Sequence, residues 1–192
     1  NEIYVDKSMI VSDLNKLAET DYDFLCISRP RRFGKSMVGN LISAYYSKGC
    51  DTREIFSQMK IGQVPDYDKY LNKLNVIKLD LNGWYQNAKK KNEHQNLISQ
   101  IDECVAEEFH EQFANVNFSE KEKSIDSCIL KVYKETGEKF VIIIDEYDVL
   151  VRERVSEELF QDYLSFLNGL FKDTTLRPAI ALAYITGIIP IV

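Results

Sequence analysis

The sequence predicts an α/β protein in which helices flank a mainly parallel sheet. The strongest observation is the β-branched run Phe140–Ile144, whose continuous apolar pattern is typical of a central parallel strand buried on both faces. The run Ala179–Gly187 has the same character, and the shorter run Phe24–Ile27 leads into a polar loop and a helical pattern. Alternation in Asn75–Leu81 predicts a fourth strand, which Asn82-Gly83 would end. We therefore expect one α/β domain with these four strands at its centre.

Composition limits the classes of protein to consider. A length of 192 residues suits one domain, and 45% hydrophobic with 28% charged residues is typical of a globular protein. The formal net charge of −6 does not favour nucleic-acid binding over the whole surface. No apolar run approaches the roughly 20 residues that span a bilayer, and no secretory signal opens the chain, so we expect a cytoplasmic protein without membrane contact. Because the sequence begins at Asn1, we expect a fragment of a longer protein.

The cysteines predict neither a zinc site nor a disulfide framework. None stands in a Cys-x-x-Cys pair, and the chain has only two histidines. Buried, reduced thiols are the preferred interpretation. The four residues concerned are Cys26, Cys50, Cys104 and Cys128.

A phosphate-binding loop is predicted where the first strand meets the helical pattern Met37–Tyr46. Gly34 would let the backbone approach a phosphate, Lys35 would reach the outer phosphates, and Ser36 would offer its hydroxyl to Mg²⁺. Backbone N–H groups at a helix N-terminus surround phosphate oxygens, and the helix dipole favours their charge. The usual first glycine is replaced by Arg29, so these three residues alone do not distinguish a phosphate loop from a helix that begins with Gly-Lys-Ser. The residues assigned to nucleotide binding are Arg29, Pro30, Arg31, Arg32, Phe33, Gly34, Lys35, Ser36 and Met37.

Asp145-Glu146 supplies the second half of the predicted site. An acid at the end of a buried strand is costly unless a cation serves it, and Mg²⁺ held by Ser36 and Asp145 would meet that need. Glu146 is the candidate that orients or deprotonates an attacking water. Thr186 ends the strand next to the one with Asp145, where it would sense the outer phosphate or hold the water. Its alternative role is to close a turn before Gly187.

Two further stretches are assigned from their patterns. The region from about 91 to 137 is mostly helical and is predicted to form an insertion on one side of the domain. Arg152 and Arg154 are interpreted as members of a surface ion network; the alternative is an arginine that reaches the phosphate of a neighbouring subunit.

With these pieces placed, the sequence resembles a bacterial and archaeal family of AAA-ATPase-like proteins. The resemblance extends from Tyr4 to Gly187, and in this family Arg-Pro commonly stands where the ordinary loop has its first glycine. Relatives often have a proline shortly after the acidic motif, where this chain has Val149-Leu150-Val151. The matching stretches are Arg29-Pro30-Arg31-Arg32-Phe33-Gly34-Lys35-Ser36, the most specific, then Tyr4-Val5-Asp6-Lys7, Ile143-Ile144-Asp145-Glu146-Tyr147-Asp148 and Ile185-Thr186-Gly187.

The resemblance implies an ASCE-type P-loop NTPase core, a three-layer α/β/α fold with the acid-bearing strand inserted beside the strand that feeds the loop. It also implies Walker A and Walker B motifs, which bind ATP and Mg²⁺. Relatives commonly carry a C-terminal domain similar to PD-(D/E)XK nucleases, through which nucleic acid would be a partner. We expect that domain and any lid to lie outside residues 1–192, and a homo-oligomer is a further expectation.

The function predicted from the sequence is Mg²⁺-dependent hydrolysis of ATP, coupled to an effector or DNA-related domain. Lys35 would hold the phosphates, Ser36 and Asp145 the metal, and Glu146 the water, with Thr186 as sensor. The alternative is a nucleotide-gated switch with little turnover, in which the arginines of the loop bind a partner. A P-loop kinase is disfavoured, because Asp145-Glu146 suits the activation of water better than a bound acceptor hydroxyl.

Overall fold

The structure is a computed structural model that describes residues 5–30 and 34–189. Its residues divide into two compact units. The first unit comprises Asn1–Leu79, Phe140–Asp145 and Ala181–Val192, and the second comprises Asp80–Lys139 and Glu146–Ile180. The predictions for Tyr4, Arg31, Arg32 and Phe33 fall outside the described residues.

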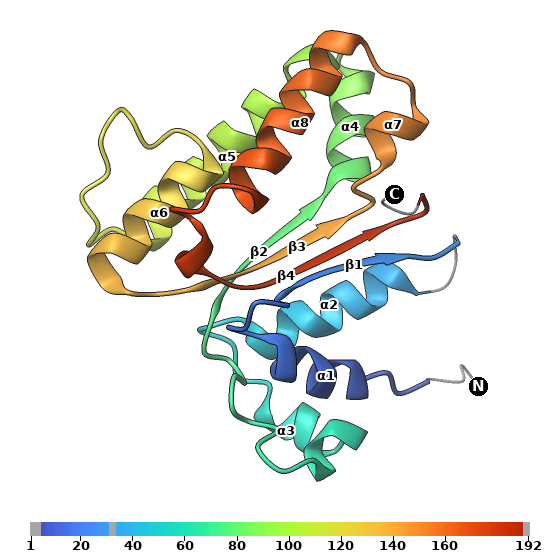
Figure 1. The fold of residues 1–192 in the computed structure, drawn as a ribbon, viewed down its shortest axis with the longest axis vertical. Helices are drawn as coiled ribbons and strands as arrows, with labels where there is room; N and C mark the ends of the chain where they lie inside the picture. The colour runs from blue at the N-terminus through green and yellow to red at the C-terminus, as the bar shows by residue number, and fades with distance from the viewer. Residues whose placement is uncertain (1–4, 31–33, 190–192) are drawn as a thin grey trace. The chain divides into compact units, whose positions relative to one another are not determined.

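Four parallel strands form one sheet, which confirms the predicted α/β, P-loop-like fold class (Figure 1). Their order across the sheet is β1-β4-β3-β2. The expectation that the acid-bearing strand lies beside the strand that feeds the loop is therefore wrong, because β4 lies between them. The strands are β1 (Phe24–Ser28), β2 (Asn75–Asp80), β3 (Phe140–Asp145) and β4 (Ile180–Gly187).

The edge strand β1 is less buried than the two inner strands. Every residue of β3 is buried and all but one of β4, whereas no residue of β1 is fully buried. A continuous apolar strand is stabilised most when neighbours cover both of its sides. Cys26 of β1 is exposed, as is Cys50, so the prediction of buried thiols is wrong for these two and correct for Cys128.

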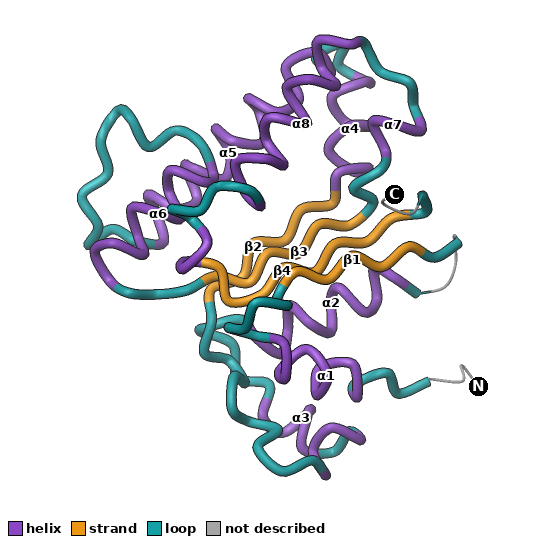
Figure 2. Tube along the Cα trace, in the orientation of Figure 1, coloured by secondary structure: helices purple, strands orange, loops and turns teal. Residues whose placement is uncertain are grey.

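The helices of the first unit pack on one face of the sheet (Figure 2). Side chains of α1 and α2 share a core with Val141 and Ile143 of β3 and with Leu182 and Tyr184 of β4. At Gly39, α2 lies against β3, where a Cβ atom would make an ordinary van der Waals contact of 3.6 Å with Ile143 Cγ2. The helical elements of this unit are α1 (Met9–Leu17), α2 (Lys35–Tyr46), α3 (Arg53–Ser57) and the 3₁₀ turn η1 (Lys60–Gln63).

Helices make up most of the second unit, and they include the region from about 91 to 137. Asn82-Gly83 does not end the preceding segment in a turn, because α4 begins at Leu81 and runs through it. The Asp80 carboxylate caps this helix by accepting from Gly83 N at 3.0 Å, and a Cβ atom on Gly83 would lie 2.7 Å from Asp80 Oδ2. The elements are α4 (Leu81–Lys90), η2 (His94–Asn96), α5 (Leu97–Gln112), α6 (Ile125–Thr136), α7 (Val149–Arg152), α8 (Glu157–Phe171) and η3 (Arg177–Ala179).

Within the described ranges, every helix is too short or too polar to cross a membrane.

Candidate functional site

The period of the strands places the candidate residues on the face of the sheet that α2 covers. Alternate residues of a strand share a face. On β3, Val141 and Ile143 enter the core beside α1 and α2, so Asp145 follows them on the same side. On β4, Thr186 likewise follows Tyr184. Because the carboxyl ends of parallel strands meet at one edge of the sheet, both side chains lie where the loop enters α2.

Asp145 is the centre of this cluster. The Ser36 hydroxyl donates a hydrogen bond to Asp145 Oδ2, and the Thr186 hydroxyl donates one to Asp145 Oδ1. Asp145 is only 6% exposed and Thr186 only 1%. A buried carboxylate needs such donors, since removal from water destabilises the charged form. The structure thus brings together three of the residues predicted from the sequence.

Lys35 contacts the loop that precedes it. Its ammonium donates to the carbonyl oxygens of Arg29, at 2.8 Å, and Pro30, at 3.1 Å. Gly34, the N-cap residue of α2, has φ 75° and ψ 27°, the left-handed conformation that costs glycine least. The backbone N–H of Arg29 donates to the carbonyl of Gly187 at 3.0 Å, so the first part of the loop continues the pairing of β1 with β4.

Met37, the last residue assigned to nucleotide binding, lies in the first turn of α2. Its side chain is 58% exposed. An apolar side chain offers nothing to an anion. The part of Met37 that is suited to an anion is its backbone N–H, because it lies at the helix N-terminus.

Tyr184 is a neighbour of the cluster that the sequence analysis did not identify. Burial, followed by the charge of Asp145, raises the pKa of its phenol to about 12, and Arg29 acts in the opposite direction. The signal that would have found Tyr184 is the two-residue period of β4, which places it on the same face as Thr186.

The donor atoms at Asp145 fit a magnesium ion. Mg²⁺ prefers oxygen ligands and is usually held by one or two protein groups, with water and substrate phosphate completing its shell. The Ser36 hydroxyl and a carboxylate oxygen of Asp145 are adjacent in the structure and are ligands of this kind. These two residues would hold the metal, as the sequence predicts.

Glu146 belongs to the second unit, where it is paired with an arginine. It has a positive φ of 54°, which is uncommon for a residue with a side chain. Arg152 Nη2 donates to Glu146 Oε2, and Arg152 Nε lies 3.3 Å from Asp148 Oδ2. The side chain of Arg152 is 15% exposed and that of Asp148 only 1%. Arg152 therefore belongs to an ion network, as predicted, but the network is partly buried: the side chain of Glu146 is 26% exposed.

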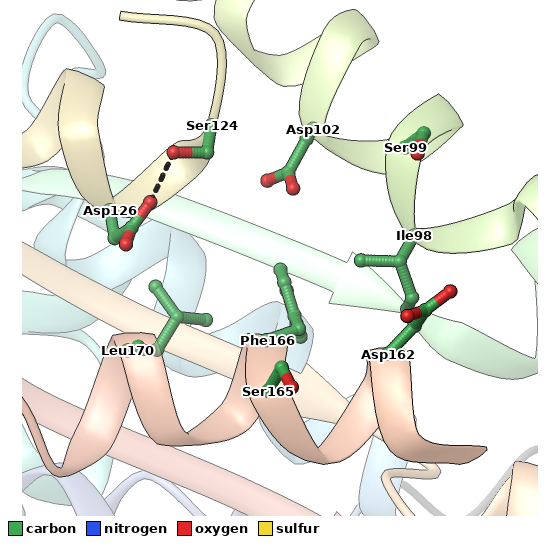
Figure 3. Close-up of a pocket in the computed structure, with 10 residues that line it drawn as sticks. Ile98, Ser99, Asp102, Ser124, Asp126, Asp162, Ser165, Phe166 and Leu170 are labelled. Atoms are coloured by element: carbon green, nitrogen blue, oxygen red, sulfur yellow. Dashed lines mark hydrogen bonds between the residues drawn. The ribbon is translucent and has the colours of Figure 1, made fainter. Parts of the chain in front are cut away.

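A separate cavity of about 340 Å³ lies within the second unit, between α5, α6 and α8 (Figure 3). Asp102, Asp126 and Asp162 line it together with serine and apolar side chains. Burial raises the pKa of Asp102 to about 6, and the charge of Asp126 adds to the effect, while a hydrogen bond from Ile125 N opposes it. Carboxylates repel phosphate, so this cavity does not suit a nucleotide.

Comparison with known proteins identifies a family. A family model described as a predicted AAA-ATPase matches residues 1–192. Neither the curated proteins nor the solved structures gave a match.

Proposed function

Because the chain belongs to the AAA-ATPase-like family, a family of predicted AAA-ATPases, we propose that it binds ATP at the loop before α2 and hydrolyses it with Mg²⁺. The observation that carries the proposal is the contact of Ser36 and Thr186 with the buried carboxylate of Asp145. Helix N-terminus, hydroxyl and strand-end acid are the groups that phosphoryl transfer on a P-loop requires.

Each residue has a defined part in this proposal. On ATP binding, Lys35 would leave the carbonyls of Arg29 and Pro30 and donate to the outer phosphates. Bound Mg²⁺ would neutralise charge that develops on the phosphate oxygens. Glu146 would orient the attacking water and accept its proton, and Thr186 would respond to the outer phosphate through its contact with Asp145.

One observation favours the alternative of a nucleotide-gated switch with little turnover. Arg152 pairs with Glu146 in the structure, and a carboxylate engaged by a guanidinium is a poor acceptor for a proton from water. Hydrolysis would require that this pair rearranges. In the switch, ATP would set the conformation of an attached effector, and coupling to DNA would belong to that effector.

Measurements of ATP binding and phosphate release test the proposal. Lys35→Ala is expected to abolish ATP binding, whereas Lys16→Ala, at an exposed lysine of α1, should leave it unchanged. Glu146→Gln should keep ATP binding and lower turnover about 10²–10⁴-fold, the usual contribution of a general base. Normal ATP binding by Lys35→Ala would show that the loop assignment is wrong.

The same assay separates the two functions. Steady-state phosphate release should be run with and without DNA, together with labelled ATP and candidate acceptors. Tight binding of ATP with release at background in both conditions would support the switch. Transfer of the label to an acceptor would show that the protein is a kinase and that hydrolysis is not its reaction.

A further inference from the structure

Lys7 lies beside Gly34, the glycine that immediately precedes α2. A Cβ atom built on Gly34 would be 2.8 Å from Lys7 Nζ, closer than carbon and nitrogen atoms approach without displacement. The ammonium therefore occupies the space that the missing side chain of Gly34 leaves open. Lys35, the residue after Gly34, places a second ammonium at the same loop, where it donates to the carbonyl of Arg29.

Hydrogen bonds on both sides of Lys7 fix its backbone. Asp6 Oδ1 accepts from Ser8 N, and Asp6 Oδ2 accepts from Lys60 N, both at 2.8 Å. The Ser8 hydroxyl accepts from Ile61 N at 3.1 Å, and Ser8 is fully buried. The segment is thus attached to η1, which holds the base of the Lys7 side chain in place.

The bonds to Asp6 also define its role. Burial tends to raise the pKa of its carboxyl, but the bonds from Ser8 and Lys60 outweigh burial and lower the pKa overall. Asp6 is therefore ionised and committed to backbone donors at neutral pH. It anchors the segment, and Lys7, whose side chain is exposed, is the residue that the segment presents to the loop.

We propose that Lys7 is a second phosphate-binding lysine, which contacts the bound triphosphate beside Gly34. The inference rests on the proposed function, since it concerns the ligand of the same loop. A triphosphate carries several negative charges, and a lysine ammonium binds phosphate oxygens as a point charge. Lys35 reaches the phosphates from the helix, and Lys7 reaches them from the segment before α1.

Lys7→Met tests the proposal, because it keeps the aliphatic stem and removes the charge. Lys16→Met is the matched control: it removes the same charge from an exposed lysine of α1 that pairs with Asp13. Equilibrium binding is measured for Mg²⁺-ATP and for inorganic tripolyphosphate, which lacks the base. Lys7→Met should weaken both by about tenfold, the size of one hydrogen bond to a charged group. Lys16→Met should change neither by more than about twofold, and Lys7→Arg should keep most of the affinity.

Three results would overturn the inference: unchanged binding by Lys7→Met, an equal loss in Lys16→Met, or a loss for ATP without one for tripolyphosphate. A loss for ATP alone would show that Lys7 acts on the base or on the shape of the loop and does not contact the phosphates. If the wild-type protein does not bind ATP, the proposed function fails and this inference falls with it. Lys7→Gln gives the same comparison if Lys7→Met does not fold.

Discussion

The carboxylate of Asp145 combines two properties that conflict in most proteins. It is largely buried, which disfavours its charge, yet it accepts hydrogen bonds from Ser36 and Thr186, which favour it. Binding of a cation at this carboxylate would require one of these hydroxyls to turn to another acceptor. A buried acid with replaceable donors is suited to exchange one hydrogen bond for a metal ligand.

Asp145→Asn is expected to weaken ATP binding about tenfold in the presence of Mg²⁺ and to leave it unchanged in EDTA. The amide keeps the size of the side chain but lacks the charge that holds the metal. Calorimetric titration with and without Mg²⁺ measures both values, and Asp13→Asn on the surface of α1 is the control. Equal losses in the two buffers would show that Asp145 acts only through the structure of the loop.

At the scale of elements, β3 and β4, which carry the proposed site residues Asp145 and Thr186, are also the most buried strands. Of the residues in β3 and β4, only Ile185 is not buried. The β3 strand ends in the polar residue Asp145, and β4 ends in Thr186 followed by Gly187. A rigid strand fixes the position of its last side chain better than a loop does. The β1 strand, at the edge, leads instead into the loop that is proposed to bind the nucleotide.

The helices of the second unit carry a prediction about pH. The Asp102 carboxyl, between α5 and α6, has its pKa raised to about 6 by burial and by the nearby charge of Asp126. In the unfolded chain the value is about 3.9, so the folded state binds more protons between these pH values. The contribution of Asp102 to the free energy of unfolding should therefore fall as pH rises from about 4 to about 6, and level off above.

Asp102→Asn should remove this decline and stabilise the protein at pH 7 by about 1 kcal/mol, a value reduced for the partial exposure of the group. Its amide oxygen can still accept the bond from Ile125 N, which is 2.9 Å in the wild type. Urea unfolding followed by Trp84, the only tryptophan, reports on α4 of the same unit. The same dependence of stability on pH in the wild type and in Asp102→Asn would contradict the prediction.

At the scale of the whole molecule, the residues proposed to bind the nucleotide belong to the first unit, and the residue proposed to activate water belongs to the second. The first unit contains the loop, Ser36, Asp145 and Thr186. Glu146 belongs to the second unit, where it is the first residue of the segment Glu146–Ile180. Direct contacts of the phosphates would therefore affect the first unit, whereas a change at Glu146 and Arg152 would affect the second.

Hydrogen exchange measured with and without Mg²⁺-ATP should show this division. We expect slower exchange at the start of α2 and at the ends of β3 and β4, because a ligand that binds only the folded state suppresses local opening. The helices α5 and α6 serve as the internal control and should not change. Protection confined to the second unit would contradict the proposed site, and an additional change in α7 would favour the switch.

Much of the fold could be predicted because its signals are local. Four strands and the helix after the loop followed from apolar patterns and from Gly34-Lys35-Ser36, and all are present within a residue or two of their predicted ends. The end of β2 was misjudged because Asp80 caps α4, a side-chain bond that overrides the tendency of Asn82-Gly83 to form a turn.

The sequence by itself determined the residues on which the proposed chemistry rests: the loop before α2, an acid at the end of a buried strand, and a second acid beside it. These features depend on residue type and on short spacings, both of which are visible in the sequence. Only the tertiary structure decided that β4 separates β1 from β3, that Lys7 lies against Gly34, and that Arg152 holds Glu146. The order of strands and the partners of long side chains depend on packing between segments far apart in the chain, which local patterns do not encode.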